Sequence, residues 1–173
     1  MTSTTPTRTK RNWRRSNRRQ RLTAGTSANW RSEMILDTNF LIALDTGMPS
    51  AVRTAREIER QGRPRRVPEI VVYELWVAVG KGTETAQNRQ KYERLLDGLP
   101  TVGFTSAVMK RAGELEGEAQ AADPNASGVG AADAIVAATA LELDEPVVTD
   151  DERDFVNRMQ EHLGYTDLRV ELY

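Results

Sequence analysis

The sequence predicts a single α/β domain of three layers, with a central parallel sheet flanked by helices, behind a basic N-terminal tail. Two observations predict it. From Met34 onward, short apolar runs of the kind that form strands alternate with longer segments that have a helical period. Strands separated by helices are typical of a parallel sheet covered on both faces. The length of 173 residues is enough for one domain with a sizeable core.

The first half of the predicted domain opens with MILD (34–37), a short apolar run typical of a strand. A later helix is predicted because Val52, Ala55 and Ile58 recur at helical spacing and Gly62 follows them. In order, the elements predicted for this half are strand 34–37, helix 39–45, helix 50–62, strand 65–68, apolar helix 69–80 and exposed amphipathic helix 83–99.

The second half contains the most obvious loop, DPNASGVG (123–130), which holds Asp, Pro, Asn, Ser and two glycines in eight residues. The helix before it starts at Ser106, a good capping residue. Residues 131–143 are nearly all small and apolar, which predicts a buried helix. In order, the predicted elements are strand 101–104, helix 106–122, the loop, helix 131–143, strand 146–149, helix 151–164 and strand 168–172.

Residues 1–33 differ from the rest of the chain in charge. They hold nine basic residues and one acid, whereas residues 34–173 hold 15 basic and 24 acidic residues. The tail shows no apolar period, so we expect it to be disordered. Two interpretations remain open. Its arginines could neutralise nucleic-acid phosphates while Trp13 stacks on a base, or Met34 is the true start.

Several functional classes are excluded by what the sequence lacks. Without cysteine there are no disulfides, zinc thiolates or cysteine nucleophile. No run is long enough to span a membrane and no secretory signal is present, so we expect a cytoplasmic protein with no membrane partner. His162 is the only histidine, which argues against a two-histidine ribonuclease or a Ser–His triad. There is no phosphate-binding GxxxxGK[ST] loop.

Glu74 is the one charged side chain in EIVVYELWVAVG (69–80) beyond Glu69. Its neighbours at helical spacing are apolar, and so are the side chains on the opposite side of the helix, including Trp76. The pattern therefore predicts that Glu74 is buried with no face open to water. A buried carboxylate costs several kcal/mol unless it is protonated or compensated, so we expect a functional reason for it.

Three further acids, Asp37, Asp133 and Asp151, follow predicted strands or begin a helix. Each has a structural alternative, because Asp37 and Asp151 suit helix N-caps and Asp133 suits a first helical turn. In a parallel sheet, however, the ends of the strands meet at the topological switch point, where ligands bind. Four carboxylates gathered there would repel one another unless a divalent cation lay among them, and oxygen ligands favour Mg²⁺ or Mn²⁺.

Four features of the sequence, in this order, resemble the PIN-domain nucleases: MILDTNFLIAL, the helical Glu74, GAADAIVAATAL and VVTDDERDF. They look most like the toxin ribonucleases of VapBC toxin–antitoxin pairs, and the resemblance covers residues 34–173. By position, the residues that match the family's site are the core acids Asp37, Glu74 and Asp133, the fourth acid Asp151, and the supporting polar residues Thr38, Asn39 and Thr149. Asp150 and Asp154 are extra acids and remain alternatives for the fourth position.

The resemblance implies hydrolysis of RNA phosphodiester bonds with Mg²⁺ or Mn²⁺ as cofactor. It also implies a cognate VapB-like antitoxin and a homodimer. Candidates for contacts with RNA phosphates are Lys81, Arg89 and Arg94, which follow the Glu74 helix. The alternative is a catalytically silent PIN-like scaffold or an RNA-binding module, which the presence of all four acids disfavours. A haloacid-dehalogenase-type phosphatase would carry a second Asp where Asn39 stands, and the acid and lysine pattern of a receiver-like switch is absent.

Overall fold

The structure, a computed structural model, describes residues 33–83, 85–122 and 128–173. The tail predicted for residues 1–33 therefore falls, apart from Glu33, outside the described residues. In chain order the elements are β1 (Met34–Leu36), α2 (Thr38–Asp45), α3 (Pro49–Arg60), β2 (Arg65–Pro68), α4 (Glu69–Lys81), α5 (Thr85–Leu96), β3 (Thr101–Val102), α6 (Ser106–Ala122), α7 (Ala131–Leu143), β4 (Val147–Thr149), the π-helix η2 (Arg153–His162) and β5 (Val170–Leu172).

The five strands form one parallel sheet in the order β3-β2-β1-β4-β5. From β1 the chain builds outward through β2 and β3, and then returns to the other side of β1 to add β4 and β5. The order thus reverses between β1 and β4. In open parallel sheets this switch point, at the carboxyl ends of the strands, is where ligands bind. The predicted fold class is confirmed.

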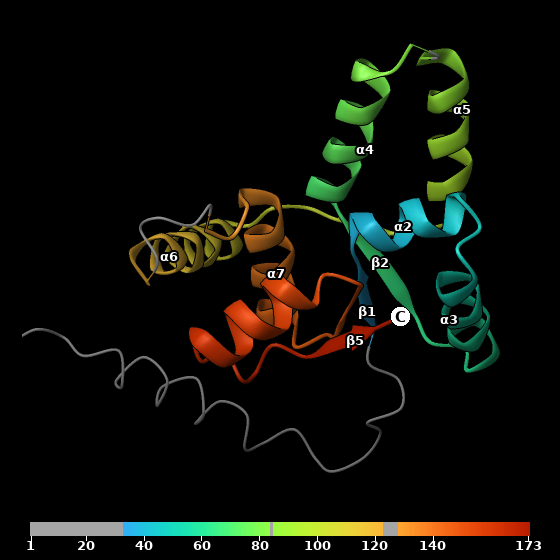
Figure 1. Ribbon diagram of the computed structural model, residues 1–173. Coiled ribbons are helices and arrows are strands. Elements are labelled where there is room, and N and C mark those ends of the chain that lie inside the picture. The colour runs from blue at the N-terminus through green and yellow to red at the C-terminus, as the bar shows by residue number, and fades with distance from the viewer. Residues whose placement is uncertain (1–32, 84, 123–127) are drawn as a thin grey trace, which may run out of the picture.

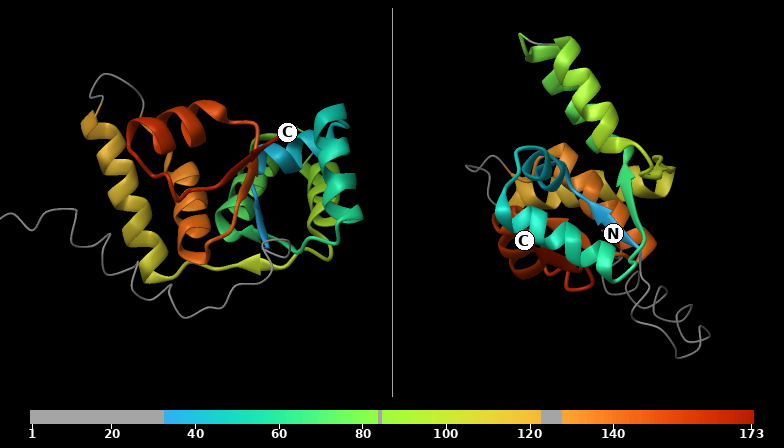
Figure 2. Two further views of the ribbon diagram at one scale, coloured as in Figure 1. Left: turned by 90° about the horizontal axis from the view of Figure 1, so that it is seen from below. Right: turned by 90° about the vertical axis from the view of Figure 1, so that its right-hand side faces the viewer.

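Helices cover both faces of the sheet, which gives the three predicted layers (Figures 1 and 2). Helices α6, α7 and η2 lie on one side, and α2 and α3 lie on the other. The middle strand β1 is 2% exposed or less at every residue, as expected for a strand covered on both faces. Helix α7 is the most buried helix, with every residue from 134 to 141 buried. Its many alanines let it pack closely against β1 and β4.

Helices α4 and α5 form a hairpin that projects past the rest of the domain (Figure 1). Only Val71, Leu75 and Val79 of α4 are buried, and they lie four residues apart on one stripe. Helix α5 has no buried residue, in agreement with the exposed amphipathic helix predicted for this segment. The projection matters for the site because α4 carries Glu74.

The predicted elements are all present, with two differences in form. The strand expected over 101–104 is only Thr101–Val102, and the last helix winds as a π-helix rather than an α-helix. The wider turn ends with the amide of Leu163 donating to the carbonyl of Arg158, five residues back, at 2.9 Å. Among the described residues, no helix is both long and apolar enough to cross a membrane.

Candidate metal-binding active site

Asp37 lies at the carboxyl end of β1, where it caps α2, and its exposed fraction is 2%. Its Oδ1 accepts a hydrogen bond from the amide of Thr38 at 2.8 Å, and its Oδ2 accepts one from the hydroxyl of Thr149 at 2.8 Å. Burial raises the pKa of Asp37 to about 6, although these two hydrogen bonds act in the opposite direction. The carboxylate is therefore fixed at the switch point between β1 and β4.

Thr149 ends β4 and connects Asp37 to the next acid along the chain. Its Oγ1 accepts a hydrogen bond from the amide of Asp151 at 3.1 Å while it donates to Asp37. The carboxylate of Asp151 in turn accepts from the amide of Asp154 at 2.9 Å, a capping contact at the start of η2. The structural alternative noted for Asp37 is thus present, because Asp37 is the N-cap of α2, and Asp151 makes a similar contact just before η2, whose N-cap is Glu152. Both acids also lie beside the switch point.

Glu74 reaches the same region from α4, where its Oε2 accepts a hydrogen bond from the hydroxyl of Thr38 at 2.5 Å. The prediction that this side chain is buried without a face to water is wrong. Glu74 is half-buried, and the adjacent Tyr73 is 64% exposed. The reason is the projecting hairpin, which leaves even the apolar Trp76 only partly covered.

Asp133 lies in the first turn of α7, as its alternative interpretation anticipated. A Cβ atom at Gly130 would lie 3.1 Å from its Oδ2, so the glycine leaves room for the carboxylate. Burial, and after it the charges of four other acids, raises the pKa of Asp133 to about 7. Those acids are Asp37, Asp151, Asp154 and Glu74. The four predicted acids are therefore close enough to interact.

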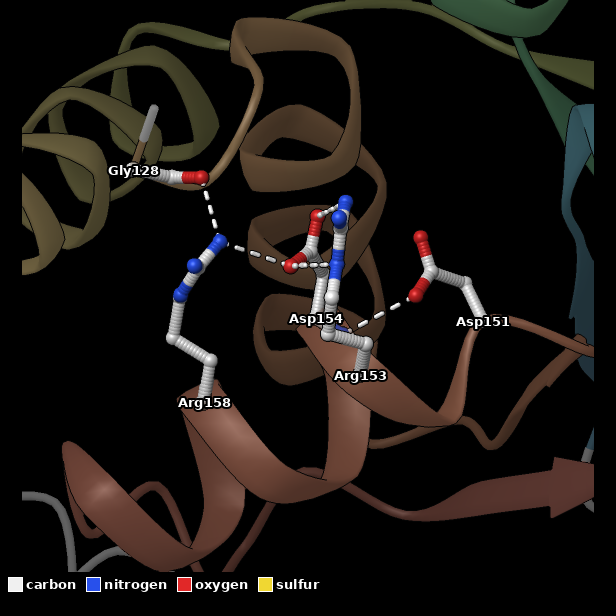
Figure 3. Close-up of polar contacts among 5 residues, drawn as sticks. All are labelled: Gly128, Asp151, Arg153, Asp154 and Arg158. Atoms are coloured by element: carbon white, nitrogen blue, oxygen red, sulfur yellow. Dashed lines mark hydrogen bonds and ion pairs between the residues drawn. The ribbon is translucent and has the colours of Figure 1, made fainter. Parts of the chain in front are cut away.

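Asp154, which the sequence offered only as an alternative, is buried among these acids with an exposed fraction of 3%. Asp133, Asp151 and Asp154 each offer one carboxylate oxygen, and these three oxygens all lie within 4.8 Å of one another. Unlike the other two, however, Asp154 is paired with two arginines, Arg153 and Arg158 (Figure 3). The spacing of Asp154 and Arg158, four residues apart in a predicted helix, is the signal that could have revealed this pairing.

The remaining candidates lie at the edge of this arrangement or away from it. Asp150 is exposed. The pKa of Tyr173 is raised mainly by the burial of Tyr173 and next by the charge of Asp150. Asp150 is not among the acids that raise the pKa of Asp37 or Asp133. The other predicted polar residues are all exposed. Asn39 lies on α2, Lys81, Arg89 and Arg94 lie on the α4–α5 hairpin, and His162 lies on η2. Lys81 is seven residues, about two helical turns, beyond Glu74.

The sequence of residues 34–160 matches the family model of the PIN domain. The chain belongs to the PIN-domain family. The resemblance expected from the four motifs is therefore confirmed for the family, and the PIN domain accounts for the order of the strands and helices. No curated protein matches the sequence.

Solved structures similar to this PIN domain include VapBC complexes from several bacteria. VapBC2 of Rickettsia felis, bound to a DNA fragment from its promoter, has a TM-score of 0.66 at 21% identity, over 82% of this chain and 98% of that one. The DNA-bound VapBC of Salmonella typhimurium gives 0.64 at 20% identity, over 82% and 98%. VapBC-1 of nontypeable Haemophilus influenzae gives 0.62 at 20%, over 80% and 96%. At these identities the likeness is one of fold.

The donor atoms that this PIN domain brings together suit a hard divalent cation. Asp37, Glu74, Asp133 and Asp151 offer only carboxylate oxygens, which Mg²⁺ and Mn²⁺ prefer. The raised pKa of Asp133 has mutual repulsion of the acids among its causes, and a cation among them would remove that repulsion. The residues present therefore fit such a group.

We expect Asp133→Asn to stabilise the metal-free PIN domain at pH 8 and to have little effect at pH 4. The pKa of Asp133 is about 7 in the folded chain, well above the ordinary value of an Asp. The free energy of unfolding therefore falls as the pH rises from about 4 to 7, because over this range the carboxyl ionises in the unfolded chain but stays protonated in the folded chain. The amide escapes this cost, which we put at about 2 kcal/mol, or roughly 5 °C in Tm, after allowing for solvent screening. Thermal unfolding in EDTA at both pH values measures it. An equal change at both would contradict the electrostatic cause.

Proposed function

We propose that this PIN domain is a divalent-metal-dependent ribonuclease and the toxin of a type II toxin–antitoxin pair. The observation that carries the proposal is the meeting of Asp37, Glu74, Asp133 and Asp151 at the switch point of the sheet, where each of the other three acts on the pKa of Asp133. Membership of the PIN-domain family and the fold shared with VapBC proteins support it. We take Asp151 as the fourth acid.

In the proposed mechanism, Asp37, Glu74, Asp133 and Asp151 hold Mg²⁺ or Mn²⁺, which would polarise the scissile phosphate and activate a water molecule. The threonines orient the carboxylates. Thr149 fixes one oxygen of Asp37 by donating its hydroxyl proton, and Thr38 does the same for Glu74. Such hydrogen bonds also favour the ionised carboxylates that bind cations. No histidine is needed for this chemistry, and His162 is exposed on η2.

The proposed antitoxin partner has a suitable surface on α2 and α3. A cavity of about 180 Å³ lies between these helices and the end of α5, with apolar walls that include Leu44, Ala55 and Leu95. Glu59, Arg65 and Asp97 add charge to its lining. We propose that an apolar segment of a VapB-like antitoxin fills it and sets a basic side chain against the acids. Similar structures include a member of the VapBC family of toxin–antitoxin systems from Mycobacterium tuberculosis. We also propose that this chain forms a homodimer.

The purified full chain should cleave total cellular RNA in Mn²⁺ or Mg²⁺ and should leave it intact in EDTA. Because the metal binds the folded protein, millimolar Mn²⁺ should also raise the Tm. At 100 to 1,000 times the Kd, binding adds roughly 3–4 kcal/mol to the free energy of unfolding. Gel electrophoresis and thermal unfolding test the two parts. If RNA is bound but stays intact, and the Tm does not respond to metal, the protein is instead a silent RNA-binding module.

A further inference from the structure

One buried carboxylate in this structure has two cationic partners (Figure 3). Asp154 Oδ1 accepts from Arg158 Nη1 at 2.7 Å and from Arg153 Nε at 3.1 Å, while Asp154 Oδ2 accepts from Arg153 Nη2 at 3.2 Å. The Asp154 side chain is 4% exposed. A single negative charge needs one partner to offset its burial. The second arginine is therefore not needed to offset the charge of Asp154 itself.

The two arginines are not equivalent. Arg158 has a side chain that is 22% exposed, makes the shorter contact, and also donates to the backbone carbonyl of Gly128, so it is tied on two sides. The Arg153 side chain is 71% exposed, and its contacts with Asp154 are both longer. Exposed ion pairs contribute little to stability because water screens them. Arg158 is thus the structural partner of Asp154, and Arg153 can be shared.

Arg153 also lies at the edge of the acids proposed to hold the metal. Its hydrogen bond with Asp154, followed by the charges of Asp154, Asp151 and Asp133, raises the pKa of its guanidinium. Figure 3 shows Arg153 between Asp154 and Asp151, with Arg158 on the far side of Asp154. An RNA strand approaching this acidic centre meets strong repulsion, which a cation at the solvent-facing rim would reduce.

We propose that Arg153 binds a phosphate of the RNA substrate, sharing its guanidinium between Asp154 and a non-bridging phosphate oxygen. The proposal rests on the ribonuclease function proposed above and names a substrate-binding residue for the same site. The planar guanidinium suits phosphate because its N–H groups form paired hydrogen bonds to two oxygens. Asp154 then anchors two arginines and is not the fourth metal ligand, which leaves that position to Asp151.

The test compares Arg153→Gln and Arg153→Lys with Arg56→Gln, which removes the same charge from an exposed position on α3. Steady-state cleavage of a short single-stranded RNA in Mn²⁺ gives kcat and KM at several salt concentrations. Arg153→Gln should lower kcat/KM by about 10- to 100-fold and reduce the slope of log(1/KM) against log[salt] by about 0.7, the loss of one phosphate contact. Arg153→Lys should be intermediate, and Arg56→Gln within about twofold of wild type.

A purely structural role predicts a different result. Because Arg158 still neutralises Asp154, the Tm of Arg153→Gln and its increase in Mn²⁺ should equal those of wild type, whereas Arg158→Gln should lower the Tm. The proposal is overturned if Arg153→Gln cleaves like Arg56→Gln, or if its loss of activity comes with a lower Tm or a weaker response to Mn²⁺. Cleavage by the wild type separates the two proposals. An active wild type with an unaffected Arg153→Gln rejects this inference alone, whereas an inactive wild type rejects the ribonuclease function as well.

Discussion

Asp37→Asn should reduce RNA cleavage by about 10³-fold or more in kcat/KM, equivalent to about 4 kcal/mol of transition-state stabilisation. The substitution removes a charge from the proposed metal site. It also places an amide where two oxygens accept hydrogen bonds from Thr38 and Thr149, so the oxygen that accepts from Thr149 becomes a nitrogen that cannot accept. Single-turnover cleavage of a labelled RNA in saturating Mn²⁺ measures the effect, with circular dichroism to establish that the variant is folded.

The matched controls for this prediction act on Thr149, which touches no metal in the proposed arrangement but orients Asp37. Thr149→Ser keeps the hydroxyl and should retain activity within a few-fold. Thr149→Val has nearly the same shape without the hydroxyl, so Asp37 and the amide of Asp151 each lose a partner, and we expect about a tenfold loss. If Asp37→Asn kept a tenth of the wild-type activity, Asp37 could not be a metal ligand.

Expression of the full chain in a bacterial host should arrest growth, and co-expression with the small reading frame next to its gene should relieve the arrest. The reason is that a basic side chain set against Asp37, Asp133 and Asp151 would offset their charges as a metal does, and would exclude the substrate. Colony counts and co-purification measure the two parts. The complex should contain at least two copies of this chain, which light scattering can determine. A harmless wild type, or arrest that Asp37→Ala leaves in place, would reject the toxin.

Ala55→Arg separates the antitoxin surface from the active site. Ala55 lies on α3 and lines the cavity beside α2, and it is not one of the residues of the candidate metal site. A charged side chain there should prevent an apolar segment from filling the cavity. The variant should therefore still arrest growth and cleave RNA. Co-expression with the small reading frame should no longer relieve the arrest, and its product should no longer co-purify with the variant. Relief equal to wild type would place the antitoxin on another surface.

The positions of the helices and most of the acids could be predicted from the sequence because local signals determine them. The predicted helices 106–122 and 131–143 agree with α6 and α7 to the residue, because the loop sequence between them, rich in Asp, Asn and Gly, separates the two helical patterns. The predicted cap is wrong by one residue, since the hydroxyl of Thr105, not Ser106, accepts from the amide of Val108 at the start of α6. The acids that follow strands meet because parallel topology brings the carboxyl ends of β1 and β4 together.

The features that were missed depend on tertiary packing. An apolar period shows which face of a helix is hydrophobic but not whether another element covers it, so the half-exposed state of Glu74 could not be predicted. The sequence likewise could not show that Arg158 also donates to the carbonyl of Gly128, because this contact spans thirty residues. Both cases concern residues at the candidate site, where ordinary patterns of burial are least reliable.

The α4–α5 hairpin is joined directly to the sheet at the junction between β2 and α4. β2 ends at Pro68 and α4 begins at Glu69, so no flexible linker separates the hairpin from the sheet. With a rise of 1.5 Å per residue, Glu74 lies about 8 Å from this junction and Lys81 about 18 Å from it. If the hairpin moved as a rigid body about this junction, Glu74 would therefore be displaced a little less than half as far as Lys81, and its distance from Asp37 would change with it.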